Sequence, residues 1–128
     1  MTRLHHLALG TRDVSTLARF YCDALELCEL VRHAFPDGAL RSIWLALGDS
    51  VLMIEHTEDS PPHVTGIGAG FFLLAFAVTP DDRMRLEAKL EAQGSSIESR
   101  TEWTSYARDP DGNRIALSAY PLETSARR

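Results

Sequence analysis

The sequence has few of the features that mark secreted, membrane or metal-cluster proteins. Cys22 and Cys28 are its only cysteines, so a disulfide framework is excluded, and their spacing does not form a CxxC pair. No apolar run approaches the roughly 20 residues of a membrane helix. The first residues enter a strand pattern directly, without the apolar segment of a signal peptide. We therefore expect reduced thiols, a cytoplasmic location and no membrane contact.

The chain also lacks a cluster of basic residues. It contains 18 acidic and 13 basic side chains, which gives a formal net charge of -5. Proteins that bind DNA or RNA normally present a positive patch to the phosphate backbone. We expect no nucleic-acid partner.

The length and composition are those of one ordinary globular unit. The 128 residues are 45% hydrophobic and 24% charged, and a chain of this size buries roughly two-thirds of its unfolded surface. No linker interrupts the pattern. We expect a single domain over residues 1–122 and a short tail at 123–128.

Two stretches have the periodicity of amphipathic helices. They cover about 14–26 and 80–93, and they follow the capping residues Asp13 and Thr79. Patterns typical of strands precede and follow each helix, at 4–9, 28–35, 41–47, 51–56, 70–78, 96–98, 103–107 and 114–119. The order βαβββ therefore occurs twice, in modules at about 1–57 and 70–121. This predicts an α+β fold with a curled, mostly antiparallel sheet and both helices on its outer face.

An alignment of the two modules points to a candidate site. The segment 7–9 matches 74–76, which sets His6 against Leu73, and matching the final strands sets Glu55 against Ala116. Strand alternation turns these four positions away from the helices. We expect them to line a cup-shaped site.

The motifs of this chain resemble the vicinal oxygen chelate superfamily, which includes glyoxalase I, bleomycin-resistance-type binding proteins, fosfomycin-resistance enzymes and extradiol dioxygenases. The resemblance covers nearly the whole chain and rests on 4–9, 20–27, 53–55, 74–78 and the Asp-Pro-Asp-Gly-Asn turn at 109–113. It implies two βαβββ modules around a half-open cup, commonly in a homodimer. Two modules with open sheet edges can also pair through identical surfaces, which would give a symmetric homodimer.

The resemblance also implies up to four metal ligands, one from each of four strands. His6 and Glu55 fall on the first two ligand positions, whereas Leu73 and Ala116 fall on the third and fourth. A leucine and a methyl group have no lone pair to donate. Two interpretations stay open: a weakly held divalent metal such as Zn, Ni, Mn or Fe, or a hydrogen-bonded polar pair with no metal.

A cup without metal must hold its ligand by shape, stacking and a few hydrogen bonds. Arg41 and Arg114 are candidate anchors for a ligand carboxylate or phenolate, and His33 is a candidate neighbour of the cup. The predicted ligand-binding cup consists of Trp44, Met53, Leu73, Trp103, Tyr106, Arg114 and Ala116.

Two functions from different classes follow. The first is a small-molecule binding protein of the glyoxalase/bleomycin-resistance type that holds an organic, partly aromatic ligand in a largely apolar cup. The alternative is a metal-dependent lyase, isomerase or dioxygenase that uses His6 and Glu55 as ligands. In glyoxalase I, as the resemblance implies, a glutamate at the fourth position moves protons, and Ala116 removes that group. Whether the protein is an enzyme, its catalytic residues and its ligand stay open.

Overall fold

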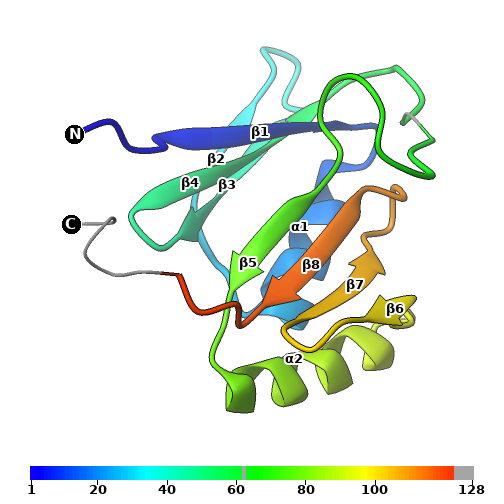
Figure 1. Cartoon of the computed structure of the whole chain (residues 1–128). Helices are drawn as coiled ribbons and strands as arrows, with labels where there is room; N and C mark the ends of the chain where they lie inside the picture. The colour runs from blue at the N-terminus through cyan, green and yellow to red at the C-terminus, as the bar shows by residue number, and fades with distance from the viewer. Residues whose placement is uncertain (62, 123–128) are drawn as a thin grey trace.

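The computed structural model describes residues 1–61 and 63–122, so the expected tail at 123–128 lies outside the described residues. It consists of two successive βαβββ units (Figure 1), and the predicted α+β fold with an internal repeat is confirmed. The first unit contains β1 (His6–Thr11), α1 (Val14–Leu25), β2 (Cys28–Ala34), β3 (Leu40–Leu47) and β4 (Ser50–His56). The second contains β5 (Leu74–Ala77), α2 (Pro80–Ala92), β6 (Ser99–Arg100), β7 (Thr104–Arg108) and β8 (Arg114–Ser118).

Each unit forms its own four-stranded sheet. The strand orders are β1-β4-β3-β2 and β5-β8-β7-β6, so the two sheets are separate where the sequence pattern predicts one curled sheet. In each sheet the first strand pairs with the fourth in parallel, and the other two pairings are antiparallel. Strands β1 and β5 are therefore both edge strands with one unpaired side.

The two helices begin where the capping residues predict. The Asp13 carboxylate accepts a hydrogen bond from the backbone N–H of Thr16 at 3.0 Å, and the Thr79 hydroxyl accepts one from Asp82 N–H at 3.1 Å. At the end of α1, Glu26 adopts the left-handed conformation with φ of 63°. Its carboxylate pairs with Arg85 and Lys89 of α2, which joins the end of the first helix to the second.

Both sheets contribute to a single hydrophobic core. Helix α1 contributes seven buried residues, while α2 contributes Leu86 and Leu90. The sheets contribute Ile43, Leu45, Leu52, Ile54, Phe76, Ala107, Ile115 and Leu117. Alternate residues on the strands point away from this core, and we call the sides on which they lie the open faces of the two sheets.

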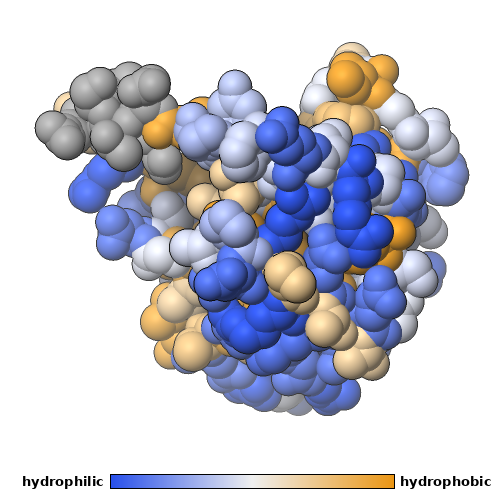
Figure 2. Space-filling model, turned by 60° about the horizontal axis from the view of Figure 1, so that its bottom comes forward, coloured by the Kyte–Doolittle hydropathy of each residue, from blue (hydrophilic) through white to orange (hydrophobic). Residues whose placement is uncertain are grey.

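The surface on the α2 side of the molecule is largely hydrophilic (Figure 2). Helix α2 buries two of its 13 residues, so most of its side chains lie at this surface. In the part of the chain that the structure describes, neither helix is long and apolar enough to cross a membrane.

Two predicted strands of the second unit differ from the structure. The strand predicted at 70–78 begins only at Leu74, which pairs with Ile115 of β8. Gly70 has a positive φ of 85°, which is not an extended conformation, so the strand cannot include it. The strand predicted at 96–98 is displaced to Ser99–Arg100, although Glu98 N–H still donates to the Tyr106 carbonyl at 2.8 Å.

Candidate functional site

A cavity of about 490 Å³ lies between the edge strands β1 and β5. Its lining includes residues 6–10 of β1, residues 71–74 leading into β5, Val64 of the preceding connection, and Asn113 and Arg114 at the start of β8. Most of these side chains are apolar. The connection from β4 to β5 passes over the end of β1 (Figure 1), so it supplies one wall of the cavity.

Arg108 fixes this connection to the second sheet. Its guanidinium donates to the Val64 carbonyl at 2.6 Å and to the Gly112 carbonyl at 3.0 Å, and it also pairs with Glu98 at 3.3 Å. Since Val64 lines the cavity, the side chain of Arg108 helps to position that wall.

The guanidinium of Arg114, which lines the cavity, lies close to two aromatic rings. Its guanidinium carbon is 4.7 Å from the centre of the Phe72 ring and 4.6 Å from that of Tyr106. Both distances are typical of cation–π contacts. The Arg114 Nε atom is buried and has no hydrogen-bond partner, and its guanidinium forms no ion pair with any residue described here.

The turn before Arg114 is held by a buried carboxylate. Asp109 accepts a hydrogen bond from the side-chain amide of Asn113 at 2.8 Å, and its other oxygen accepts from the backbone N–H groups of Asp111 and Asn113. The Tyr21 hydroxyl donates to the same carboxylate at 2.7 Å. Burial raises the pKa of Asp109 above its ordinary value, while the hydrogen bonds from Tyr21 and Asn113 oppose that shift.

A second group of polar residues lies on the open face of the first sheet. Trp44 Nε1 donates to Glu55 Oε2 at 2.9 Å, and the His33 ring packs edge-on against Trp44 with centroids 4.8 Å apart. His33, Ser42 and Glu55 form one row across β2, β3 and β4, because Ser42 pairs with both of the others. His33 Nε2 and Ser42 Oγ are buried without a partner in the described chain.

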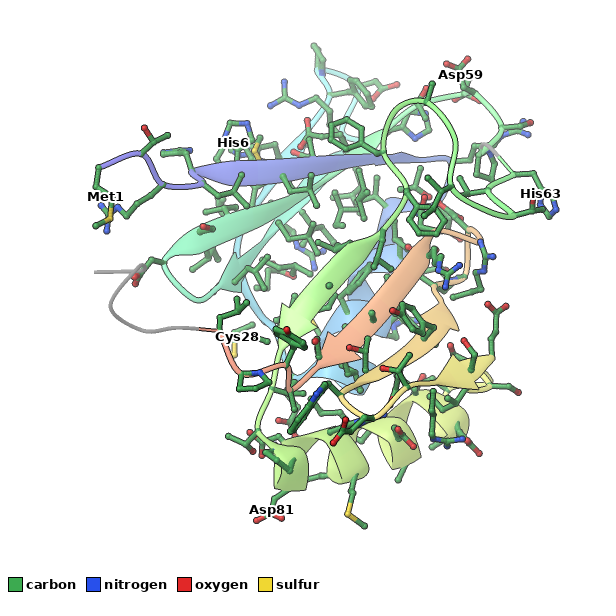
Figure 3. The ribbon with its side chains drawn as sticks, in the orientation of Figure 1. Met1, His6, Cys28, Asp59, His63 and Asp81 are labelled. Atoms are coloured by element: carbon green, nitrogen blue, oxygen red, sulfur yellow. The ribbon has the colours of Figure 1, made fainter. Side chains whose placement is uncertain are left out.

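His6 and Glu55 do not form a contact. His6 pairs with Val51, and Glu55 pairs with Gly10. The two predicted ligands are therefore four residues apart along the sheet, or about 13 Å at roughly 3.3 Å per residue. His6 instead contacts His5 through the two Nδ1 atoms at 2.9 Å. Figure 3 shows His6 near the start of β1 and His63 at the opposite end, on the connection that follows β4.

The pairing of the strands changes the expected equivalence between the two units. Ala8 pairs with Met53, and Ala75 pairs with Ala116. If 7–9 is equivalent to 74–76, the counterpart of Ala116 is therefore Met53, and Glu55 lies two residues further along its strand. The alignment of Glu55 with Ala116 is thus wrong by two residues, because sequence similarity alone does not define how a strand pairs with its neighbour.

Within one chain, this geometry does not bring a set of metal ligands together. Within residues 1–61 and 63–122, no group of three or more His, Cys, Asp or Glu side chains could hold an ion together. Leu73 and Ala116 supply no donor atoms at two of the four positions. Of the two predicted ligands, His6 contacts His5, whereas the Glu55 carboxylate lies elsewhere and accepts a hydrogen bond from Trp44.

The predicted cup residues separate into several places. Leu73 and Arg114 line the cavity with His6, and Tyr106 contacts Arg114. Trp44 and Met53 lie on the first sheet, whereas Trp103 lines a different hollow of about 410 Å³ beside α2. Ala116 pairs with Tyr106 and is buried.

Sequence reasoning missed several cavity residues. Phe71 and Phe72 were covered by the predicted strand, Asn113 was interpreted only as a turn residue, and Val64 lies in an irregular connection. The pair of adjacent phenylalanines before β5 was the available signal, since two neighbouring aromatic side chains cannot both enter the core from one strand.

Comparison with known proteins defines the family. Residues 3–117 match the model of the Glyoxalase/Bleomycin resistance protein/Dioxygenase superfamily. The chain belongs to this superfamily, as the sequence resemblance predicted. A comparison with curated proteins found no match.

Solved structures share the fold at low sequence identity. A mutant of the fosfomycin resistance protein FosX from Listeria monocytogenes, in complex with Mn(II) and 1S,2S-dihydroxypropylphosphonic acid, is 18% identical, with a TM-score of 0.80 and 98% of each chain covered. A glyoxalase/dioxygenase from Nostoc punctiforme is 22% identical, with a TM-score of 0.76, covering 94% of this chain and 92% of the other. Lactoylglutathione lyase from Agrobacterium tumefaciens is 19% identical, with a TM-score of 0.67, covering 92% and 93%.

Proposed function

We propose that this protein binds a small organic molecule in the cavity between β1 and β5 and holds it without a metal ion. The observation that carries the proposal is the cavity itself. Its volume of about 490 Å³ lies within the range of ligand sites, roughly 300–1,000 Å³. Its apolar lining is interrupted by a few polar groups, His6, Asn113 and Arg114, and such a mixture is typical of sites that orient an organic ligand.

The alternative function is a metal-dependent lyase, isomerase or dioxygenase. The structure of FosX with Mn(II) supports metal use in a protein of the same fold. In this chain, however, Leu73 and Ala116 carry no donor atoms, and the separation of His6 from Glu55 argues against a shared ion. The donor set therefore favours metal-free binding.

We further infer a homodimer in the cytoplasm. Strands β1 and β5 each have one unpaired edge, and the connection beside them exposes Ile67 and Phe71 at 87% and 95%. Exposed apolar groups beside open strand edges are typical of protein interfaces. The two free cysteines suit a reducing compartment. Light scattering should give twice the chain mass of 14.2 kDa, and a value equal to the chain mass would contradict the dimer.

The binding proposal can be tested by filling the cavity from β1. A panel of hydrophobic and aromatic metabolites is screened by thermal shift in the presence of EDTA, so that any metal contribution is removed. Ala8→Phe should abolish the stabilisation by a binding compound, because Ala8 lines the cavity. Ala75→Phe is the matched control, since Ala75 is an exposed alanine of the other edge strand that does not line it. Stabilisation by divalent ions alone, never by organic compounds, would overturn the proposal.

A further inference from the structure

We infer that the ligand of this cavity carries an anionic group, a carboxylate or a phosphonate, and that the guanidinium of Arg114 binds it. This inference rests on the proposed binding function and specifies the chemical class of its ligand. Three observations support it: the aromatic contacts of Arg114, the lack of a carboxylate partner for its charge in the described chain, and the apolar lining of the rest of the cavity.

Two aromatic contacts restrict the guanidinium. Phe72 and Tyr106 are 4.7 and 4.6 Å from its central carbon. A guanidinium donates hydrogen bonds in its own plane, and the two rings offer no carboxylate or carbonyl oxygen to accept them, so the contacts restrict the cation while its N–H donors stay available. Planar donors that are already oriented match the two oxygens of a carboxylate or phosphonate, and little side-chain entropy is lost on binding.

The charge of Arg114 has no partner in the described chain. Five other arginines, Arg32, Arg83, Arg85, Arg100 and Arg108, pair with carboxylates. Arg114 does not, although the protein has an excess of acidic residues, and its buried Nε atom makes no hydrogen bond. A buried donor without an acceptor destabilises a protein unless something completes it.

The position of Arg114 in the sheet adds to this cost. Arg114 pairs directly with Arg108 across β7 and β8, and like charges opposite one another in an antiparallel pair are unfavourable. Arg108 forms an ion pair with Glu98 and donates hydrogen bonds to two carbonyl groups. Because Arg114 has no carboxylate partner in the described chain, an anion bound to it in the cavity would reduce the repulsion between the two arginines.

The remainder of the cavity defines the body of the ligand. Residues 71–74 and the alanine and leucines of β1 offer apolar surface, and no acidic side chain of the described residues lines the cavity. The lining therefore favours a compound with an apolar or aromatic body and one anionic group. A cationic compound would be repelled by Arg114, and no carboxylate of the described lining would compensate for this repulsion.

The experiment compares three probes that differ mainly in charge: 1-naphthoate, its neutral amide 1-naphthamide, and the cation 1-naphthylmethylammonium. Binding to the full chain is measured by isothermal titration calorimetry in EDTA. Naphthoate should bind about tenfold or more tightly than naphthamide, because the carboxylate forms an ion pair with the guanidinium and offers two acceptor oxygens, whereas the amide is uncharged and offers one. The cation should bind most weakly.

Variants separate the anion site from the fold and from the cavity. Arg114→Met keeps an unbranched apolar side chain against Phe72 and Tyr106, and it should bring the preference for naphthoate close to onefold while naphthamide binds as before. Arg114→Lys should retain part of the preference. Arg41→Met is the matched control, since Arg41 is an exposed arginine that does not line the cavity, and it should change nothing.

The outcomes distinguish this inference from the proposed function. Equal affinity for naphthoate and naphthamide, lost together in Ala8→Phe, would overturn the role of Arg114 and leave the binding function in place. A preference for naphthoate that survives in Arg114→Met would overturn it as well. Failure of all three probes to bind, or binding that Ala8→Phe does not weaken, would contradict both.

Discussion

The Tyr21 hydroxyl donates a 2.7 Å hydrogen bond to the Asp109 carboxylate, and both residues are buried. Tyr21 belongs to α1 of the first unit, whereas Asp109 begins the turn before β8 of the second. This bond therefore joins the two units at the base of the turn that carries Asn113 and Arg114. Burial, together with the neighbouring Asp109, raises the pKa of Tyr21 well above its ordinary value, so the hydroxyl remains a donor at physiological pH.

Tyr21→Phe should destabilise the protein by about 1–2 kcal/mol at pH 7, because it removes a hydrogen bond to a buried carboxylate. The effect should depend on pH. The raised pKa of Asp109 means that the folded protein binds its proton more tightly than the unfolded chain does. This contribution to stability is complete at pH values below the pKa of Asp109 in the unfolded chain. It is lost as pH rises through the pKa of Asp109 in the folded protein.

The hydrogen bond from Tyr21 favours the charged form of Asp109. Because Tyr21→Phe removes this bond, the pKa of Asp109 in the folded protein should rise further. The difference in free energy of unfolding between wild type and Tyr21→Phe should therefore increase from pH 4 to pH 7. Urea unfolding at several pH values measures it. Leu45→Val, in the core of the first sheet, is a control whose effect should not vary with pH, and a constant difference for Tyr21→Phe would contradict the prediction.

A second prediction concerns Glu26, whose carboxylate pairs with Arg85 and Lys89. Hydrogen bonds from these two residues lower the pKa of Glu26 to about 2. Its contribution to stability should be present above the unfolded pKa of glutamate and disappear as pH falls towards about 2. Glu26→Gln should lower the melting temperature slightly at neutral pH and low salt, with the two curves converging near pH 2.

Both partners of Glu26 are on the surface, so 1 M NaCl should remove most of this difference by screening. Thermal melts across pH at two salt concentrations measure it. Glu102→Gln is the control, because Glu102 is exposed and forms no ion pair with a described residue. A salt-independent loss of stability in Glu26→Gln would show that the left-handed backbone, rather than the charge, is responsible.

Local patterns in the sequence predict the elements of this fold but not how they pair. The caps at Asp13 and Thr79 define the helix starts because they act within one turn of the chain. The register of β4 against β1 depends on contacts between distant residues. The repeat alignment therefore matches Ala116 to Glu55, whereas the strand pairing matches it to Met53, two residues earlier. The two halves were also expected to share one sheet, whereas their strands form two.

The candidate site could likewise be predicted only in part, from local patterns in the strands. Arg114 and Tyr106 could be predicted separately as cup residues, because strand alternation turns both away from the core. The contact between them follows from the pairing of β7 with β8, because Tyr106 pairs with Ala116, two residues from Arg114. The contact of Arg114 with Phe72 depends instead on how the connection before β5 folds. No periodic pattern describes that connection, so its aromatic residue could not be placed from the sequence.

The last prediction concerns Glu55 and metal ions. Glu55→Gln should change the melting temperature little, because the glutamine carbonyl can still accept the hydrogen bond that Trp44 Nε1 donates at 2.9 Å. Zn, Ni or Mn, added to protein purified without a histidine tag, should shift neither wild type nor the variant. Trp103→Phe leaves Trp44 as the sole tryptophan, so its fluorescence reports on the carboxylate. An ion at Glu55 would compete with the indole and change that signal. A metal-dependent change in melting temperature and fluorescence, seen with Glu55 and absent with glutamine, would favour the metal-dependent enzyme over the binding protein.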